Sequence, residues 1–243
     1  MRTAVLADIH ANLAALEAVL EDILAERISD TVILGDNIGY GPDPEEVIRE
    51  LVKQQAVSVQ GNHEYALDNP HYYRMMNPDP KKSLDMTRIM LSEESLAYAR
   101  ELPAVIIHHG ARLVHGCPPD SRTEYLFYPG RKKLAKIFNS FPERICFYGH
   151  THTLNFFDHG AAPIAGLDVN LGVYHLKNDR KYIINPGSVG QPRDGINNSA
   201  KYLIWDRVKD TVTFKALKYD VMRTVNRLRA LGFPEFNATR LLW

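Results

Sequence analysis

The sequence predicts an α/β protein with two packed β-sheets, and two patterns along the chain support this prediction. Apolar runs alternate with amphipathic stretches over residues 2–59, as in parallel strands joined by helices. Short alternating runs follow from about residue 163 to residue 217, as in antiparallel hairpins. No linker-like stretch or internal repeat separates the two parts. We therefore expect a single domain over residues 1–243.

The N-terminal part is expected to contain three strands separated by two helices. The strands are the apolar runs at residues 2–7, 31–34 and 56–59. The first helix is predicted where apolar residues recur at helical spacing over residues 13–24, behind the candidate N-cap Asn12. The second begins with the capping side chain of Asp43, followed by Pro44 and by Glu46 three residues beyond the cap. Right-handed crossovers between these strands predict a parallel sheet.

The rest of the chain is less regular. Residues 64–102 contain a Tyr/Met/Pro-rich stretch and a helical segment from about residue 81 to 101, which we interpret as an excursion over the site or a helical flank. Two strands, a helix and a further strand are then expected at residues 104–107, 112–115, 131–138 and 144–148. Strand-like runs at residues 169–176, 182–184, 202–205 and 212–217 suggest an antiparallel second sheet. A last helix is expected over residues 221–230, before Gly232.

Composition argues against several classes of partner. Lys+Arg and Asp+Glu each total 29, and the resulting net charge of zero argues against a nucleic acid or an anionic membrane. Asp8 interrupts the N-terminal apolar run, which is too short for a signal peptide or a membrane span, so we expect a cytoplasmic protein. Cys117 and Cys146 lie in different segments and are expected to be reduced and packed.

Polar residues follow five of the predicted strands. They are Asp8-Ile9-His10, Gly35-Asp36, Gly61-Asn62-His63, His115-Gly116 and Gly149-His150-Thr151-His152. Each group alone has an ordinary explanation, such as a helix cap, a turn or a packed histidine. Because α/β sheets bind ligands at the carboxyl ends of their strands, we expect these groups to meet at one edge of one sheet. Their joint occurrence favours a functional site.

The side chains of this set suit divalent metal ions. Two carboxylates, one side-chain amide and four imidazoles, without a thiolate, match a pair of borderline cations. Manganese, iron, nickel, cobalt and zinc are all compatible with such ligands. His150 and His152 are two residues apart, and on a strand this spacing would point both imidazoles to the same side.

The motifs D-x-H, G-D, G-N-H-E, H-G and G-H-T-H, in this order and at these spacings, resemble those of the calcineurin-like metallophosphoesterase superfamily. They extend from residue 8 to 152, and INPGSVGQPRDG at 184–195 is similar to a later segment of its small prokaryotic phosphodiesterase branch. The resemblance implies a four-layer α/β/β/α sandwich with two mixed β-sheets flanked by helices. It also implies two divalent metal ions, for which manganese is our first expectation.

The resemblance also implies a role for each motif residue. One metal would be held by Asp8, His10, Asp36 and His152, and the other by Asp36, Asn62, His115 and His150. Asp36 would then bridge the two ions, and the two histidines of G-H-T-H would belong to different ions. His63 would face the substrate as a proton donor or a phosphate clamp.

The charge balance of such a centre suits an anionic substrate. Two divalent ions bring four positive charges; Asp8, Asp36 and a bridging hydroxide cancel three, which leaves about one to attract a phosphoryl group. The hydroxide would be the nucleophile, and a leaving alkoxide needs a proton that His63 could supply. The segment with Gly187, Ser188 and Gly190 could form a phosphate-facing loop in which Arg193 binds the substrate, or only a surface turn.

The expected substrate is a small nucleotide-like phosphate ester. After Asp36 the chain continues with Asn37-Ile38-Gly39, not with the Asp-Arg-Gly element of the superfamily's protein serine/threonine phosphatases. We therefore expect a phosphodiesterase, with phosphomonoester or dinucleoside polyphosphate hydrolysis as alternatives. A different class is a protein-binding scaffold, because the superfamily includes a retromer subunit with that role; that subunit departs from the full ligand set, which is filled here. A homo-oligomer stays open.

Overall fold

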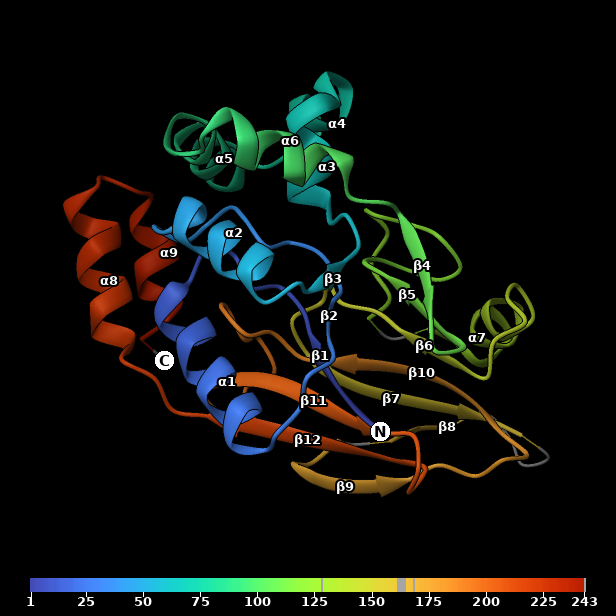
Figure 1. Cartoon of the computed structure of the whole chain (residues 1–243). Helices are drawn as coiled ribbons and strands as arrows, with labels where there is room; N and C mark the ends of the chain where they lie inside the picture. Colours follow the sequence, from blue (N-terminus) through green and yellow to red (C-terminus); the bar gives the residue numbers. More distant parts are fainter. Residues whose placement is uncertain (128, 161–164, 168, 243) are drawn as a thin grey trace.

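Two six-stranded β-sheets form the centre of the computed structural model, which describes residues 1–127, 129–160, 165–167 and 169–242 (Figure 1). The first sheet has the order β3 (Val57–Ser58), β2 (Thr31–Ile33), β1 (Arg2–Leu6), β11 (Ala200–Asp206), β12 (Thr211–Leu217), β9 (Gly172–His175). The second has the order β4 (Val105–His108), β5 (Ala111–Val114), β6 (Ile145–Phe147), β10 (Lys181–Pro186), β7 (Leu154–His159), β8 (Ala165–Leu167). Both sheets are mixed.

Strand pairing confirms the parallel N-terminal part and corrects the C-terminal one. β1 is parallel to β2, and β2 is parallel to β3. The predicted separate antiparallel sheet is wrong, because β11, β12 and β9 extend the first sheet from the other side of β1. β10 instead lies in the second sheet, parallel to β6 and antiparallel to β7. An apolar run identifies a strand but does not identify its partner, which is set by contacts distant in sequence.

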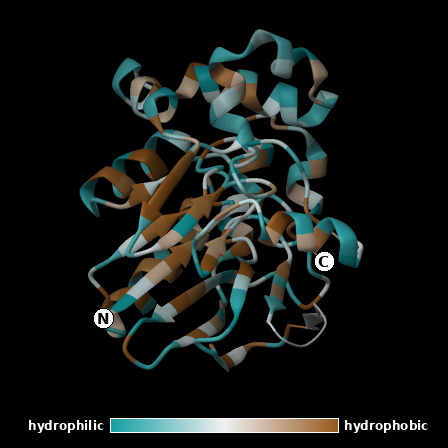
Figure 2. Cartoon of the chain, turned by 90° about the vertical axis from the view of Figure 1, so that its right-hand side faces the viewer, coloured by the Kyte–Doolittle hydropathy of each residue, from teal (hydrophilic) through white to brown (hydrophobic). Residues whose placement is uncertain are grey.

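The N-terminal strand shows why its apolar run is continuous. Val5 packs between the sheets with Phe147 of the second sheet, whereas Leu6 faces outward against Leu16 of α1 (Leu13–Ala25). Both faces of the first sheet are therefore covered, and successive residues of the strand such as Val5 and Leu6, which point to opposite faces, are both apolar. On the outer side of the second sheet, Phe138 of α7 (Arg131–Phe138) is fully buried. The predicted four-layer α/β/β/α arrangement is confirmed, and Figure 2 shows the hydrophobic residues concentrated on its strands.

The excursion after β3 is a group of four helices, where the sequence predicted a single helical segment. They are α3 (Asn62–Asp68), α4 (Pro70–Met75), α5 (Pro78–Met90) and α6 (Glu93–Glu101). The side chain of Ser92 accepts a hydrogen bond from the backbone of Ser95 at 3.2 Å and starts a new helix there. The group packs on Ile38 and Ile48 at the upper end of the sheets in Figure 1.

Two predicted helix starts have different outcomes. Asn12 caps α1 as expected, with its side chain 3.2 Å from the backbone nitrogen of Ala15. Asp43 is at the N-cap position of α2 (Pro44–Lys53), where the sequence predicted the helix start, but its side chain makes no capping hydrogen bond. Its carboxylate instead accepts a hydrogen bond from Arg227 of α8 (Val221–Ala230). The short helix α9 (Glu235–Thr239), which the sequence did not predict, follows α8.

Two smaller expectations can be compared with the structure. Cys117 and Cys146 are both free and buried, as predicted. Among the residues that the structure describes, no helix combines the length and apolarity that a membrane crossing requires.

Candidate metal centre

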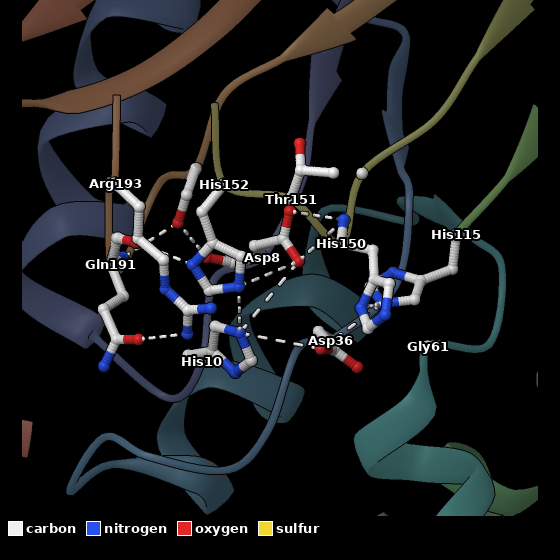
Figure 3. A network of polar contacts seen from close by, with 12 residues as sticks. Asp8, His10, Asp36, Gly61, His115, His150, Thr151, His152, Gln191 and Arg193 are labelled. Carbon is white, nitrogen blue, oxygen red and sulfur yellow. Dashed lines mark hydrogen bonds and ion pairs between the residues drawn. The ribbon is translucent and has the colours of Figure 1, made fainter. Parts of the chain in front are cut away.

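The polar residues singled out in the sequence gather in one buried cluster (Figure 3). Asp8, Asp36 and Asn62 come directly after or near the carboxyl ends of β1, β2 and β3, in the first sheet. His115 and the two histidines of G-H-T-H follow β5 and β6 of the second sheet. The expectation that all of them share the edge of one sheet is therefore wrong. The cluster lies where the carboxyl ends of two sheets meet, and each of these side chains is at most 7% exposed.

Ligand-type atoms converge in three overlapping groups. These groups are Asp8, His10, His152; Asp36, His115, His150; and His10, Asp36, His63. Within each group the side-chain nitrogen and oxygen atoms lie within 4.8 Å of one another, as a metal ion requires. His150 and His152 thus belong to different groups.

Backbone carbonyls fix the orientation of four imidazoles. They join His10 Nδ1 to Ile38 at 3.0 Å, His115 Nδ1 to Leu34 at 2.7 Å, His150 Nε2 to Thr123 at 3.1 Å and His152 Nδ1 to Gln191 at 2.6 Å. A ring nitrogen that donates to a carbonyl leaves the other nitrogen of a neutral imidazole with a lone pair. Metal-binding histidines are held in this way.

The free lone pairs point toward each other. His10 Nε2 and His152 Nε2 are 3.1 Å apart, and burial lowers the pKa of both rings well below its usual value, so both are neutral. Two neutral acceptors at this distance cannot form a hydrogen bond, whereas a cation near both could satisfy them. The donor set therefore fits a metal ion between these rings and Asp8.

In the second group the pKa values favour a proton on His115 when no metal ion is bound. His115 Nε2 lies 3.1 Å from His150 Nδ1 and 3.4 Å from Asp36 Oδ2. Although burial alone would lower it, the Asp36 carboxylate raises the pKa of His115 to about 9. Burial lowers the pKa of His150 to about 3. A metal ion would replace the proton that these groups share.

The two carboxylates differ in their charge state. Burial would raise the pKa of Asp36, but His115 and His63 hold it well below its usual range. Burial raises the pKa of Asp8 to about 8, because the nearby His115 and Arg193 compensate only in part. A cation beside Asp8 would favour its charged form.

The backbone at the cluster is strained. Asp8, His10, Asp36, His150 and His152 have φ angles of 53°, 48°, 53°, 67° and 57°. Left-handed backbone costs roughly 1–2 kcal/mol for a residue with a side chain, and such residues concentrate at functional sites. The segment from His150 to His152 is therefore a loop and not a strand, which corrects the expectation that both imidazoles project from a strand to the same side.

Residues 1–209 match the calcineurin-like phosphoesterase superfamily domain. The chain belongs to this superfamily. The resemblance drawn from the sequence motifs is thereby confirmed, and the phosphoesterases of this superfamily use divalent metal ions.

Three relatives extend the match over the whole length of this superfamily member. It is 33% identical to the uncharacterized protein MJ0912 of Methanocaldococcus jannaschii over 243 residues, which covers 98% of this chain and 96% of that one. A metallophosphoesterase from Sphaerobacter thermophilus has 37% identity and a TM-score of 0.86, with 100% and 99% of the chains covered. The hypothetical protein PH1004 from Pyrococcus horikoshii OT3 shares the fold, with 24% identity, a TM-score of 0.77 and coverage of 99% and 97%.

Glu64 connects the loop that carries Asp36 to the N-terminus of α3, where Asn62 lies, a role that the sequence did not reveal. Its fully buried carboxylate accepts hydrogen bonds from the backbone nitrogens of Asp36 at 3.1 Å, Asn37 at 2.7 Å and Gly61 at 2.9 Å. Gly61 allows the close approach, because a Cβ there would lie 2.2 Å from Asp36 Oδ1. The signal in the sequence was the last letter of G-N-H-E.

We expect Glu64→Ala to unfold at a lower denaturant concentration than the wild type. The substitution leaves at least three buried backbone donors without an acceptor, at about 1–3 kcal/mol each. Chemical denaturation of the metal-free protein measures the effect, and Glu64→Gln, which keeps one acceptor oxygen, should lie between the two. A Glu64→Ala variant as stable as the wild type would contradict this role.

The segment from Gly187 to Arg193 supports the loop that carries Asp8. Ser188 Oγ donates to the Asp8 carbonyl at 2.8 Å, and the backbone nitrogen of Gly190 donates to the same oxygen at 3.0 Å. Because Gly187, Ser188 and Gly190 are buried, the alternative of a surface turn is wrong. Ser188 and Gly190 instead hold the backbone of Asp8 in place.

The guanidinium group of Arg193 lies beside the cluster and does not use all of its hydrogen-bond donors. Its Nη2 donates to Gln191 Oε1 at 2.6 Å, whereas its buried Nε has no hydrogen-bond partner in the part of the chain that the structure describes. Its guanidinium carbon lies 5.6 Å from the ring centroid of Tyr40. Figure 3 shows the guanidinium near His10 and His152, on one side of the cluster.

Proposed function

We propose that this protein is a dinuclear metal-dependent phosphodiesterase that hydrolyses small nucleotide-like phosphate esters. The observation that carries the proposal is the position of Asp36 Oδ2, which lies 3.6 Å from His10 Nε2 and 3.4 Å from His115 Nε2. One carboxylate oxygen thus reaches both groups of imidazoles. This is the arrangement that a ligand shared by two metal ions needs.

The remaining ligands divide between the two ions. The proposed sets are Asp8, His10, Asp36, His152 and Asp36, Asn62, His115, His150. His152 Nε2 lies 3.5 Å from Asp8 Oδ1 on one side, and Asn62 Oδ1 lies 3.1 Å from His115 Nε2 on the other. The ligands mix carboxylate, amide and imidazole and include no thiolate, which suits manganese, iron, nickel, cobalt and zinc alike. Among these, manganese is the proposed ion.

The protein's own groups prepare the site for an anionic ester. When bound, two divalent ions supply Lewis acidity toward phosphoryl oxygens and lower the pKa of water. The four carbonyls described above orient the imidazoles so that the other ring nitrogen of each is directed inward. Arg193 offers its unpartnered Nε to a phosphoryl oxygen.

His63 is the proposed proton donor to the leaving oxygen. Its backbone nitrogen donates to Asp36 Oδ1 at 2.9 Å, and its ring centroid lies 4.9 Å from that of His10. Its Nδ1 is buried and has no hydrogen-bond partner among the described residues. Burial lowers the pKa of His63 and so disfavours its imidazolium form, whereas an anionic phosphoryl group beside the ring would favour that form.

Hydrolysis of two chromogenic esters tests the proposed function. Metal-stripped protein should be inactive toward bis(p-nitrophenyl) phosphate and p-nitrophenyl phosphate, and Mn²⁺ should restore turnover with preference for the diester. Preference for the monoester would favour the phosphomonoesterase alternative. No turnover of either ester by protein shown to hold both metal ions would contradict the enzyme and favour the protein-binding scaffold.

A further inference from the structure

Three aromatic rings form a stack from the candidate metal centre to the protein surface. The ring of Tyr125 stacks on that of His150 with centroids 3.7 Å apart and an interplanar angle of 17°. Phe127 stacks on the outer side of Tyr125 at 4.9 Å and 10°. Although the inner imidazole is buried, Tyr125 is 46% exposed and Phe127 is 43% exposed. We call Tyr125 and Phe127 the aromatic stack.

The loop that carries the aromatic stack is firmly attached to the body of the protein. Leu126, between the two rings, is 1% exposed and belongs to the apolar cluster under α7. Its carbonyl accepts a hydrogen bond from the Tyr148 hydroxyl at 3.2 Å. The carbonyl of Thr123 contacts His150 Nε2 at 3.1 Å. The two rings are therefore held parallel to each other and next to a proposed metal ligand.

Packing inside the protein accounts only in part for the position of the Tyr125 ring, and it does not account for the position of the Phe127 ring. Tyr125 covers His150 and could serve only to orient that imidazole. Phe127 reaches neither the imidazole nor any of the apolar clusters found among the described residues, and it exposes nearly half of its surface. Preformed, solvent-accessible aromatic rings are surfaces on which nucleobases stack.

We propose that the aromatic stack binds the nucleobase of a nucleotide substrate whose phosphoryl group is held at the His115 and His150 side of the centre. This inference rests on the proposed function, to which it adds a substrate class. It assigns the specificity for an aromatic group to Phe127, outside the ligand set. Stacking tolerates different bases, so the aromatic stack favours a nucleoside ester over a sugar ester without selecting one base.

Binding of two ligands that differ by one base tests the inference. We expect the Mn²⁺-reconstituted protein, in isothermal titration calorimetry, to bind adenosine 5′-monophosphate at least about fivefold more tightly than ribose 5-phosphate. Phe127→Ala should remove most of this difference and leave the affinity for ribose 5-phosphate unchanged. Phe127→Trp should retain it. Ile107→Ala, which truncates an apolar residue 50% exposed on β4, is the matched control and should change neither affinity.

Three results would overturn the inference. They are equal affinities of the wild type for the two ligands, no measurable binding of adenosine 5′-monophosphate, and an equal loss of both affinities in Phe127→Ala. The last result would show a structural role. Because binding is measured and not turnover, a protein that hydrolyses no ester yet prefers the nucleotide in a Phe127-dependent way would contradict the proposed function and leave the aromatic stack in place.

Discussion

Asp36→Ala should lower the turnover of bis(p-nitrophenyl) phosphate by about 1,000-fold or more. Its Oδ2 lies 3.6 Å from His10 Nε2 and 3.4 Å from His115 Nε2, so its loss affects both proposed metal ions. Metal ions contribute several kcal/mol of transition-state stabilisation, and about 4 kcal/mol corresponds to about 1,000-fold in rate. Steady-state kinetics and the metal content of the purified variant measure the effect together.

The chain offers a matched control for this substitution. Asp30 also lies with two imidazoles, those of His108 and His109, in a group whose atoms could hold a metal ion. This group is only partly buried, and Asp30 precedes β2 whereas Asp36 follows the other end of that strand. Asp30→Ala should leave turnover within a few-fold of the wild type. If Asp30→Ala removed activity and Asp36→Ala kept it, the site would be misplaced.

His63→Ala should keep both metal ions and lose about 100- to 10,000-fold in turnover, the usual contribution of a general acid. The loss should depend on the leaving group. p-Nitrophenolate needs little protonation, whereas the alkoxide that leaves a 2′,3′-cyclic nucleotide needs a proton, so the variant should lose more activity on the cyclic nucleotide. Rates on both substrates and metal content per chain are the measurements.

The competing role for His63 is that of a metal ligand. His10, Asp36 and His63 also form a group of suitable geometry. If His63→Ala lost a metal ion, or lost equal activity on both substrates, the proton-donor assignment would be wrong. His175→Ala, an exposed histidine on β9, controls for removal of an imidazole and should behave as the wild type does.

The N-terminal part of the fold was predictable because its signals are local. The apolar run at β1 stops at Asp8, and the cap at Asn12 and the helix after it follow within a few residues. The order β3-β2-β1 follows from handedness rules. The placement of β10 was not predictable, since it pairs with β6 and β7 through contacts that no local pattern records.

The sequence identified the residues of the candidate metal centre, but it did not predict their backbone conformation. The motif order identified the clustered residues, whereas the same-side orientation considered for His150 and His152 applies only to a strand. Their φ angles of 67° and 57° place them in a strained loop. Although histidine is enriched in such backbone, most histidines do not adopt it, so the residue type alone does not predict it. Glu64 was missed for a related reason, because all of its partners except Gly61 lie on a loop 26–28 residues earlier in the chain.

The number of metal ions per chain needed for turnover tests the central claim most directly. Metal-stripped protein should be titrated with Mn²⁺ while bound metal and hydrolysis of bis(p-nitrophenyl) phosphate are followed in the same samples. We expect two ions per chain at saturation, with turnover rising as the second ion binds. Full turnover with one bound ion, or none with two, would contradict a dinuclear phosphodiesterase.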